Sequence, residues 1–135
     1  MSDYLESCFS LRGKIAIVTG ASRGIGAAVA HALTSAGAHT VGLGRSEEPR
    51  AAAASGSEYR CCDILDAGAF ASACSNVFDN KGRIDVLVYA AGITLPGADD
   101  TEDSPAFRRT LDTNLVAVHS CCRTAAGFMR QTGGW

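Results

Sequence analysis

The stretch VTGASRGIG at residues 18–26 places three glycines, Gly20, Gly24 and Gly26, where an apolar run gives way to helical periodicity. The first turn of a helix presents unpaired amide groups and a partial positive charge, which suit a pyrophosphate. In such a site Gly20 lets the chain turn sharply, Gly24 lets the backbone approach a phosphate, and Gly26 lets the helix lie close to the sheet. The spacing of these glycines, G-x-x-x-G-x-G, differs from the commoner G-x-G-x-x-G. The glycines alone are therefore weak evidence, and the strand before them and the helix after them are what favour a dinucleotide site over a flexible turn.

The elements that must position this loop alternate between strands and helices. Apolar runs predict strands at residues 14–19, 39–44, 57–62 and 84–89. Helices are expected at residues 24–36, from Asp66 to Gly82 and from Ser104 to Gly133, with Asp66 and Ser104 as N-caps. Residues 45–57 read as a loop, with or without a short helix at 49–54. This alternation predicts an α/β fold, with residues 1–135 forming one Rossmann-type, doubly wound parallel sheet that is incomplete at about four βα units.

The predicted last helix carries an apolar stripe about six turns long. Its members are Phe107, Leu111, Leu115, Val118, Cys122, Ala125 and Met129.

Composition argues against several classes of function. The net charge is −2 and no basic stripe occurs, so a nucleic-acid partner is not expected. No apolar run reaches the roughly 18 residues of a membrane span, and residues 1–11 do not resemble a signal peptide, so a cytoplasmic location is predicted. The six cysteines lack zinc-site spacing and are expected to be reduced thiols, mostly used as small apolar residues, and no metal is expected. An acidic cluster at residues 99–103 is predicted to be a solvated loop.

Several ordered motifs together resemble the short-chain dehydrogenase/reductase family. They are TGASRGIG, the Asp63 of CCDILD, YAAG at residues 89–92 and the Asn114 of LDTNL. Within the family, the sequence as a whole is most similar to 3-oxoacyl-carrier-protein reductases and to sugar-acid or sugar-alcohol dehydrogenases. Tyr89 departs from the asparagine that the family carries there, which puts the positioning of the nicotinamide ribose in question.

The resemblance implies an NAD(P) cofactor and assigns residues to it. Asp63 would contact the adenine, although it could instead cap a turn, and Asn114 would support the catalytic lysine through water, although it could instead face solvent. The implied cofactor-binding residues are Gly20, Ser22, Arg23, Gly24, Ile25, Gly26, Arg45, Asp63, Ile64, Ala90, Ala91 and Gly92.

The end of the second predicted strand bears on the choice of nicotinamide. An acidic residue there usually accepts the ribose hydroxyls of NAD, but this chain has Gly44 followed by Arg45. Arg23 and Arg45 together could clamp a 2′-phosphate, which favours NADP. The opposing evidence is Glu47 and Glu48, which could reach the ribose and favour NAD if the loop folds back.

The catalytic Ser, Tyr and Lys of the family have no counterparts among these 135 residues. The only lysines are Lys14 and Lys81, and no Tyr-x-x-x-Lys occurs. The resemblance therefore implies that these residues are the amino-terminal part of an oxidoreductase that moves hydride between NAD(P) and a small alcohol or carbonyl substrate, and that this part is inactive by itself. The alternatives are a naturally short nucleotide-binding or sensor module and a non-catalytic partner of full-length relatives. Family enzymes pack the last helix against a neighbouring subunit, so the parent protein is expected to be a homo-oligomer, either a dimer or a tetramer.

Overall fold

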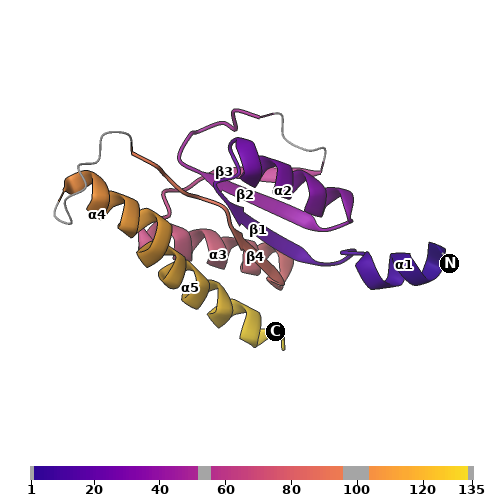
Figure 1. The fold of residues 1–135 in the computed structure, drawn as a ribbon. Coiled ribbons are helices and arrows are strands. Elements are labelled where there is room, and N and C mark those ends of the chain that lie inside the picture. The colour runs from indigo at the N-terminus through magenta and orange to yellow at the C-terminus, as the bar shows by residue number, and fades with distance from the viewer. Residues whose placement is uncertain (1, 52–55, 96–103, 134–135) are drawn as a thin grey trace.

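The computed structural model describes residues 2–51, 56–95 and 104–133, and within them four strands form one parallel sheet (Figure 1). The strands are β1 (Ile15–Thr19), β2 (His39–Gly44), β3 (Ser57–Cys61) and β4 (Val86–Tyr89). Their order in space is β3-β2-β1-β4, so that Ile17 of β1 lies between Val41 of β2 and Leu87 of β4. This arrangement confirms the α/β, Rossmann-type fold predicted from the alternation of apolar runs.

Helices cover both faces of the sheet (Figure 1). Helix α2 (Gly24–Ser35) packs on one face, where Val18, Ala21 and Ala30 form a small core. Helices α3 (Ala67–Lys81) and α5 (Ala117–Gln131) pack on the other face, over the larger core. The largest fully buried side chains of that core are Ile17, Val41, Leu43, Phe70, Val77 and Ile84. All five residues of β1 are buried, as a central strand covered on both faces requires.

Most helix ends lie where the capping residues predict. The Asp66 carboxylate accepts a hydrogen bond from the Ala69 amide at 3.0 Å, and Gly82 ends α3 with a φ of 78°. Ser104 caps α4 (Pro105–Leu111) by accepting from the Phe107 amide at 3.1 Å. These side chains and the glycine satisfy backbone groups that a helix end otherwise leaves unpaired.

The predicted last helix is not one regular element. A π-helical turn, η1 (Asp112–Val116), separates α4 from α5, and it widens the backbone spacing from i→i+4 to i→i+5. The buried face through η1 and α5 consists of Thr113, Ala117, Cys121 and Ala125. The apolar stripe predicted along one regular helix is therefore interrupted by η1, and its members Leu111, Leu115 and Cys122 are exposed. The extra residue in the wide turn changes the phase of the stripe.

The amino-terminal residues form a helix that the sequence did not indicate. Helix α1 (Ser2–Phe9) projects away from the sheet in Figure 1, with Tyr4 and Phe9 70% and 73% exposed. Residues 46–51 contain no helix, while the rest of the expected helix at 49–54 and the acidic loop at 99–103 lie outside the described residues. Among the helices that are described, none is both long and apolar enough to cross a membrane.

Asp85 joins the beginnings of β1 and β4. Its carboxylate accepts the Ile15 amide at 2.8 Å and the Arg83 Nε at 2.9 Å, and it lies 3.7 Å from Lys14 Nζ. Burial alone would raise the pKa of Asp85, but the hydrogen bonds from Arg83 and Ile15 and the charges of Arg83 and Lys14 together outweigh it, so the pKa lies below its usual value.

Candidate cofactor-binding site

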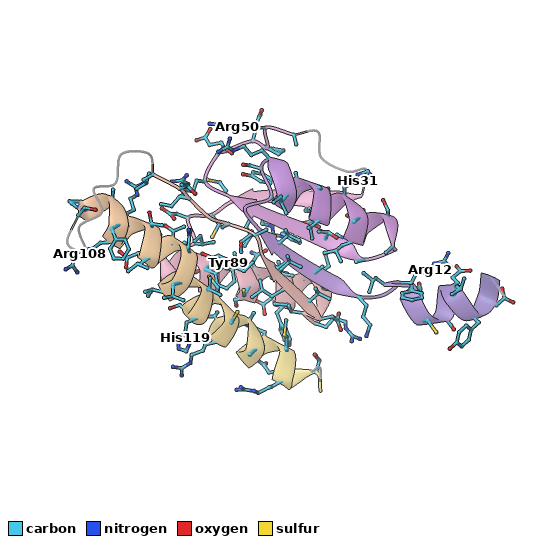
Figure 2. All side chains as sticks on the ribbon, in the orientation of Figure 1. Arg12, His31, Arg50, Tyr89, Arg108 and His119 are labelled. Atoms are coloured by element: carbon cyan, nitrogen blue, oxygen red, sulfur yellow. The ribbon has the colours of Figure 1, made fainter. Side chains whose placement is uncertain are left out.

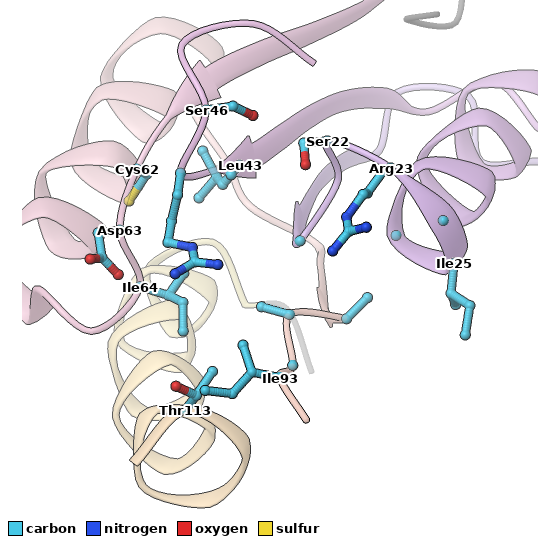
Figure 3. A pocket seen from close by; sticks show the side chains of 18 of the residues that line it. Ser22, Arg23, Ile25, Leu43, Ser46, Cys62, Asp63, Ile64, Ile93 and Thr113 are labelled. Carbon is cyan, nitrogen blue, oxygen red and sulfur yellow. The ribbon is translucent and has the colours of Figure 1, made fainter. Parts of the chain in front are cut away.

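A cavity of about 610 Å³ opens at the carboxyl ends of the strands, where ligands bind in open α/β sheets (Figure 3). The segments that follow all four strands line it. All twelve residues predicted to bind a cofactor lie in its wall. Asn114 does not line the cavity but contacts Ile93, which does. Figure 3 shows Ser22 and Arg23 on the glycine-loop side and Asp63 and Ile64 across from them.

The three loop glycines lack side chains for different reasons. A Cβ on Gly20 would lie 2.7 Å from the Ala91 Cα, so this glycine allows the loops after β1 and β4 to touch. A Cβ on Gly26 would overlap the Gly20 carbonyl oxygen, so this glycine lets the start of α2 lie close against the turn that leaves β1. Gly24 has a φ of 60° and nothing within 4 Å of its Cβ position, so open space lies above its backbone. That open space is where a phosphate can approach.

Helix α2 begins without a side-chain cap. Its N-cap residue is Arg23, in extended conformation, and no side chain accepts from the amides of the first turn. These amides and the partial charge of the helix end are available to an anion in the cavity. The Ser22 carbonyl accepts the amides of Arg50 and Ala51 at 2.7 and 2.8 Å, which brings the segment after β2 across the glycine loop.

The end of β4 and the loop after it are fixed at three points. The buried Thr19 Oγ1 accepts the amides of Ala90 and Ala91 at 3.2 and 3.3 Å. The Asn114 amide group pairs with both backbone groups of Ile93: Nδ2 donates to its carbonyl at 2.8 Å and Oδ1 accepts its amide at 2.9 Å. The Tyr89 hydroxyl donates to the Thr113 carbonyl at 2.6 Å, which ties β4 to the π-helical turn. Figure 2 shows Tyr89 between the sheet and the last helices.

Guanidinium groups dominate the charge around the cavity. Arg23, Arg45 and Arg50 line it, and none of them forms an ion pair within the described residues. Among the described residues of its wall Asp63 is the one carboxylate, and its Oδ1 also accepts the Leu65 amide at 3.0 Å, so Asp63 caps a turn as well as lining the cavity. Glu47 and Glu48 are not in the wall. Three unpaired cations beside an uncapped helix end suit a ligand that carries several phosphates.

The thiols near the cavity are not activated. Burial raises the pKa of Cys62, which lies in the cavity wall, and the thiols of Cys74 and Cys121 in the core behind it have pKa values raised by burial to about 12 and about 11. A raised pKa keeps a thiol protonated and a poor nucleophile. Cys8, Cys61 and Cys122 are exposed, so the expectation that the cysteines serve as small apolar residues fits only the buried half.

The model of the short chain dehydrogenase family matches residues 14–134. The chain belongs to the short-chain dehydrogenase family. It is 36% identical to a 3beta-hydroxysteroid dehydrogenase of Mediterraneibacter gnavus, covering 90% of this chain and 47% of the relative. It is 33% identical to a 3-oxoacyl-acyl-carrier-protein reductase of Vibrio harveyi, covering 93% and 53%. Reductases of this kind and sugar dehydrogenases both occur among the matches, as the resemblance predicted.

Solved structures of short-chain dehydrogenases share this fold. A short chain dehydrogenase from Burkholderia cenocepacia, solved in complex with NADP, has a TM-score of 0.76 and 32% identity, covering 88% of this chain and 52% of that one. The chain thus spans about half the length of the relatives it matches.

Reasoning from the family motifs missed three polar residues of the cavity wall, Ser46, Arg50 and Thr113. Thr113 lies in η1, and Ser46 and Arg50 lie in the segment after β2, where the sequence has no periodicity and no motif. The only available signal was position: Ser46 follows Arg45 directly. Arg50 could not be found this way. Two hydrogen bonds from the backbone amides of Arg50 and Ala51 to the Ser22 carbonyl bring it to the cavity, and backbone bonds leave no mark in the sequence.

Proposed function

We propose that these residues are the cofactor-binding part of an NADP-dependent oxidoreductase that transfers hydride between the nicotinamide and an alcohol or carbonyl group of a small molecule. The observation that carries this proposal is the charge of the cavity: three arginines that form no ion pair with any other described residue line it, and the end of β2 has Gly44 where a carboxylate would select NAD. The structure of the Burkholderia relative in complex with NADP supports it.

The residues of this chain would bind and orient the dinucleotide. The backbone at Gly24 and the first turn of α2 would hold the pyrophosphate, because that surface is open and uncapped. Asp63 would face the adenine half and the loop at Ala90 to Gly92 the nicotinamide half. When bound, the cofactor supplies or accepts the hydride. Asn114 is a positioning residue, since both ends of its amide hold Ile93.

We further propose that the proton-transferring Tyr and Lys and the substrate-orienting Ser of the family lie in a part of the protein outside these 135 residues. The greater length of the relatives supports this. No observation favours a short sensor module or a non-catalytic partner, and the cytoplasmic location stays a prediction. The homo-oligomer also stays a proposal, which the exposed apolar side chains of the last helices support.

Replacing the cavity arginines separately tests the cofactor choice. In the full-length protein, Arg23→Ala, Arg45→Ala and Arg50→Ala should each weaken NADPH binding roughly tenfold or more, because a charge-assisted hydrogen bond contributes about 1.5–3 kcal/mol. NADH, which lacks the 2′-phosphate, should bind with nearly unchanged affinity. Fluorescence titration of both nucleotides gives the dissociation constants.

Arg123→Ala on α5 is the matched control, because this exposed arginine is not part of the cavity wall. It should change neither affinity. Equal losses for NADPH and NADH in the cavity variants would contradict the 2′-phosphate assignment and place the arginines at the shared pyrophosphate.

A further inference from the structure

Two glycines leave a bare strip on the face of β2 that α2 covers. Gly42 and Gly44 are two residues apart in the strand and therefore face the same side. In the register of the sheet, Gly42 pairs with Tyr59 of β3. A strip without Cβ atoms exposes backbone, and an aromatic ring from the neighbouring strand can cover it.

The Tyr59 ring lies along this strip. A Cβ on Gly42 would be 2.8 Å from the Ala21 Cβ, which is too close, and 3.5 Å from the Tyr59 Cδ2, which is an ordinary contact. A Cβ on Gly44 would be 3.2 Å from the Tyr59 Cζ and would overlap its hydroxyl oxygen, with the Ser22 Cβ 3.3 Å away on the other side. Position 44 therefore has no room for any side chain while Tyr59 is in place.

The same hydroxyl anchors the segment that follows β2. It donates to the Ser46 carbonyl at 3.0 Å and lies 3.2 Å from the Ser46 Oγ. Ser46 lies in the cavity wall next to Arg45, so the position of this hydroxyl fixes both the backbone and the side chain of a residue at the site.

We propose that Tyr59 is a specificity-determining residue for the adenosine end of the cofactor. It occupies the volume in which an NAD-selecting carboxylate at position 44 would begin, and it holds Ser46, the residue next to Arg45, where a 2′-phosphate can be bound. This inference rests on the proposed NADP-dependent function. It adds that a residue of β3, outside the cavity wall, favours NADP over NAD in two ways. The Tyr59 ring blocks a side chain at position 44, and its hydroxyl group holds Ser46.

The steric half is tested by a pair of substitutions in the full-length protein. Gly44→Asp alone should lower the melting temperature, because the new side chain meets Tyr59. In a protein that already carries Tyr59→Ala, adding Gly44→Asp should lower the melting temperature less than it does in the wild type. The double variant should also prefer NADH to NADPH, the reverse of the wild-type preference. A Gly44→Asp protein that keeps the wild-type melting temperature and prefers NADH with Tyr59 present would overturn the proposal.

The hydroxyl half is tested by Tyr59→Phe, which keeps the ring and the fold. Loss of one hydrogen bond should reduce affinity for adenosine 2′,5′-bisphosphate about threefold to tenfold and leave affinity for 5′-AMP unchanged. Tyr4→Phe on the exposed helix α1 is the control and should change neither. Equal affinity of Tyr59→Phe and wild type for the bisphosphate would contradict the proposal.

The two levels of inference fail differently. A wild-type protein that binds adenosine 2′,5′-bisphosphate no better than 5′-AMP refutes the proposed NADP function, and with it the phosphate half of the role of Tyr59. A wild type that prefers the bisphosphate but is unaffected by the Tyr59 substitutions leaves the function intact and refutes the role of Tyr59.

Discussion

Gly24 combines a left-handed backbone with open space above it. Its φ is 60°, and no atom lies within 4 Å of its Cβ position. Gly13 has the same two properties, with a φ of 77° and nothing within 4 Å, but it lies in the turn before β1 and outside the cavity wall. Substitutions at these two glycines therefore distinguish the effect of backbone strain on stability from the effect of blocking a phosphate on binding.

Gly24→Val should weaken NADPH binding to the full-length protein by about 2–4 kcal/mol, since a branched side chain would occupy the space a phosphate needs. Gly13→Val should strain the backbone similarly, by about 1–3 kcal/mol of folding stability, without affecting binding. Thermal melts and NADPH titrations of both variants measure the two effects. Unchanged affinity in Gly24→Val would contradict the phosphate-binding role of that residue.

At the scale of single residues, the sequence predicted those positions whose backbone conformation restricts the residue type. The loop glycines and the capping residues Asp66 and Ser104 were predictable, because few other residue types suit those conformations. The contact between the Tyr59 hydroxyl and Gly44 was not, because it depends on which strands pair and in what register.

The π-helical turn η1 links β4 to the last helices at the scale of elements. Its Thr113 carbonyl accepts the Tyr89 hydroxyl, and Asn114 in the same turn holds Ile93. Tyr89 stands where the family carries an asparagine, so in this chain a phenol makes the connection. Burial, together with the neighbouring Cys121 and Cys122, raises the pKa of Tyr89 to about 12.

Tyr89→Phe should destabilise the full-length protein by about 1 kcal/mol at neutral pH, because the Thr113 carbonyl loses its partner. An unfolded tyrosine ionises near pH 10 and the folded one near 12, so the unfolded state loses the proton first as the pH rises. The stabilising contribution of Tyr89 is therefore complete below pH 10 and is lost between about 10 and 12. Urea unfolding across this range should show the difference between the two proteins shrinking. A constant difference up to pH 12 would contradict the shift.

The sequence could not predict η1, because a stripe of apolar residues fits a regular helix equally well. Leu111, Leu115 and Cys122 have helical spacing in the sequence, and only the packing of the small residues Ala117, Cys121 and Ala125 against α3 shows the change of phase. Helix α1 escaped prediction for a related reason: it has little contact with the core, so no buried face marks it.

Over the whole molecule, two groups of apolar side chains stay exposed: Tyr4, Leu5 and Phe9 on α1, and a second group along α4 and η1. Phe107 and Leu111 are each 38% exposed, and Leu115 and Val116 are 64% and 56% exposed. Exposed apolar residues in a group mark interfaces more often than isolated ones do. The proposed contact between subunits is therefore expected here, on the side of these helices that faces away from α3.

Leu115→Glu should reduce the oligomeric state of the full-length protein and shift the melting temperature of the isolated subunit little, because the side chain is mostly exposed. Gln131→Glu, at the end of α5, adds the same charge on an exposed residue and should leave the assembly intact. Size-exclusion chromatography with light scattering compares the two. An unchanged oligomer in Leu115→Glu would place the interface elsewhere.

The position of β1 has a consequence for synthesis of the protein. This strand leaves the ribosome first and lies at the centre of the sheet, yet β4, which completes its second edge, follows much later: the Ile15 amide bonds to a carboxylate 70 residues further along. At about 5–20 residues per second, roughly 4–14 s pass before that edge can close. Throughout this time Ile15 and Ile17 lack β4 and α5 as cover, so the nascent chain presents an apolar strand to solvent.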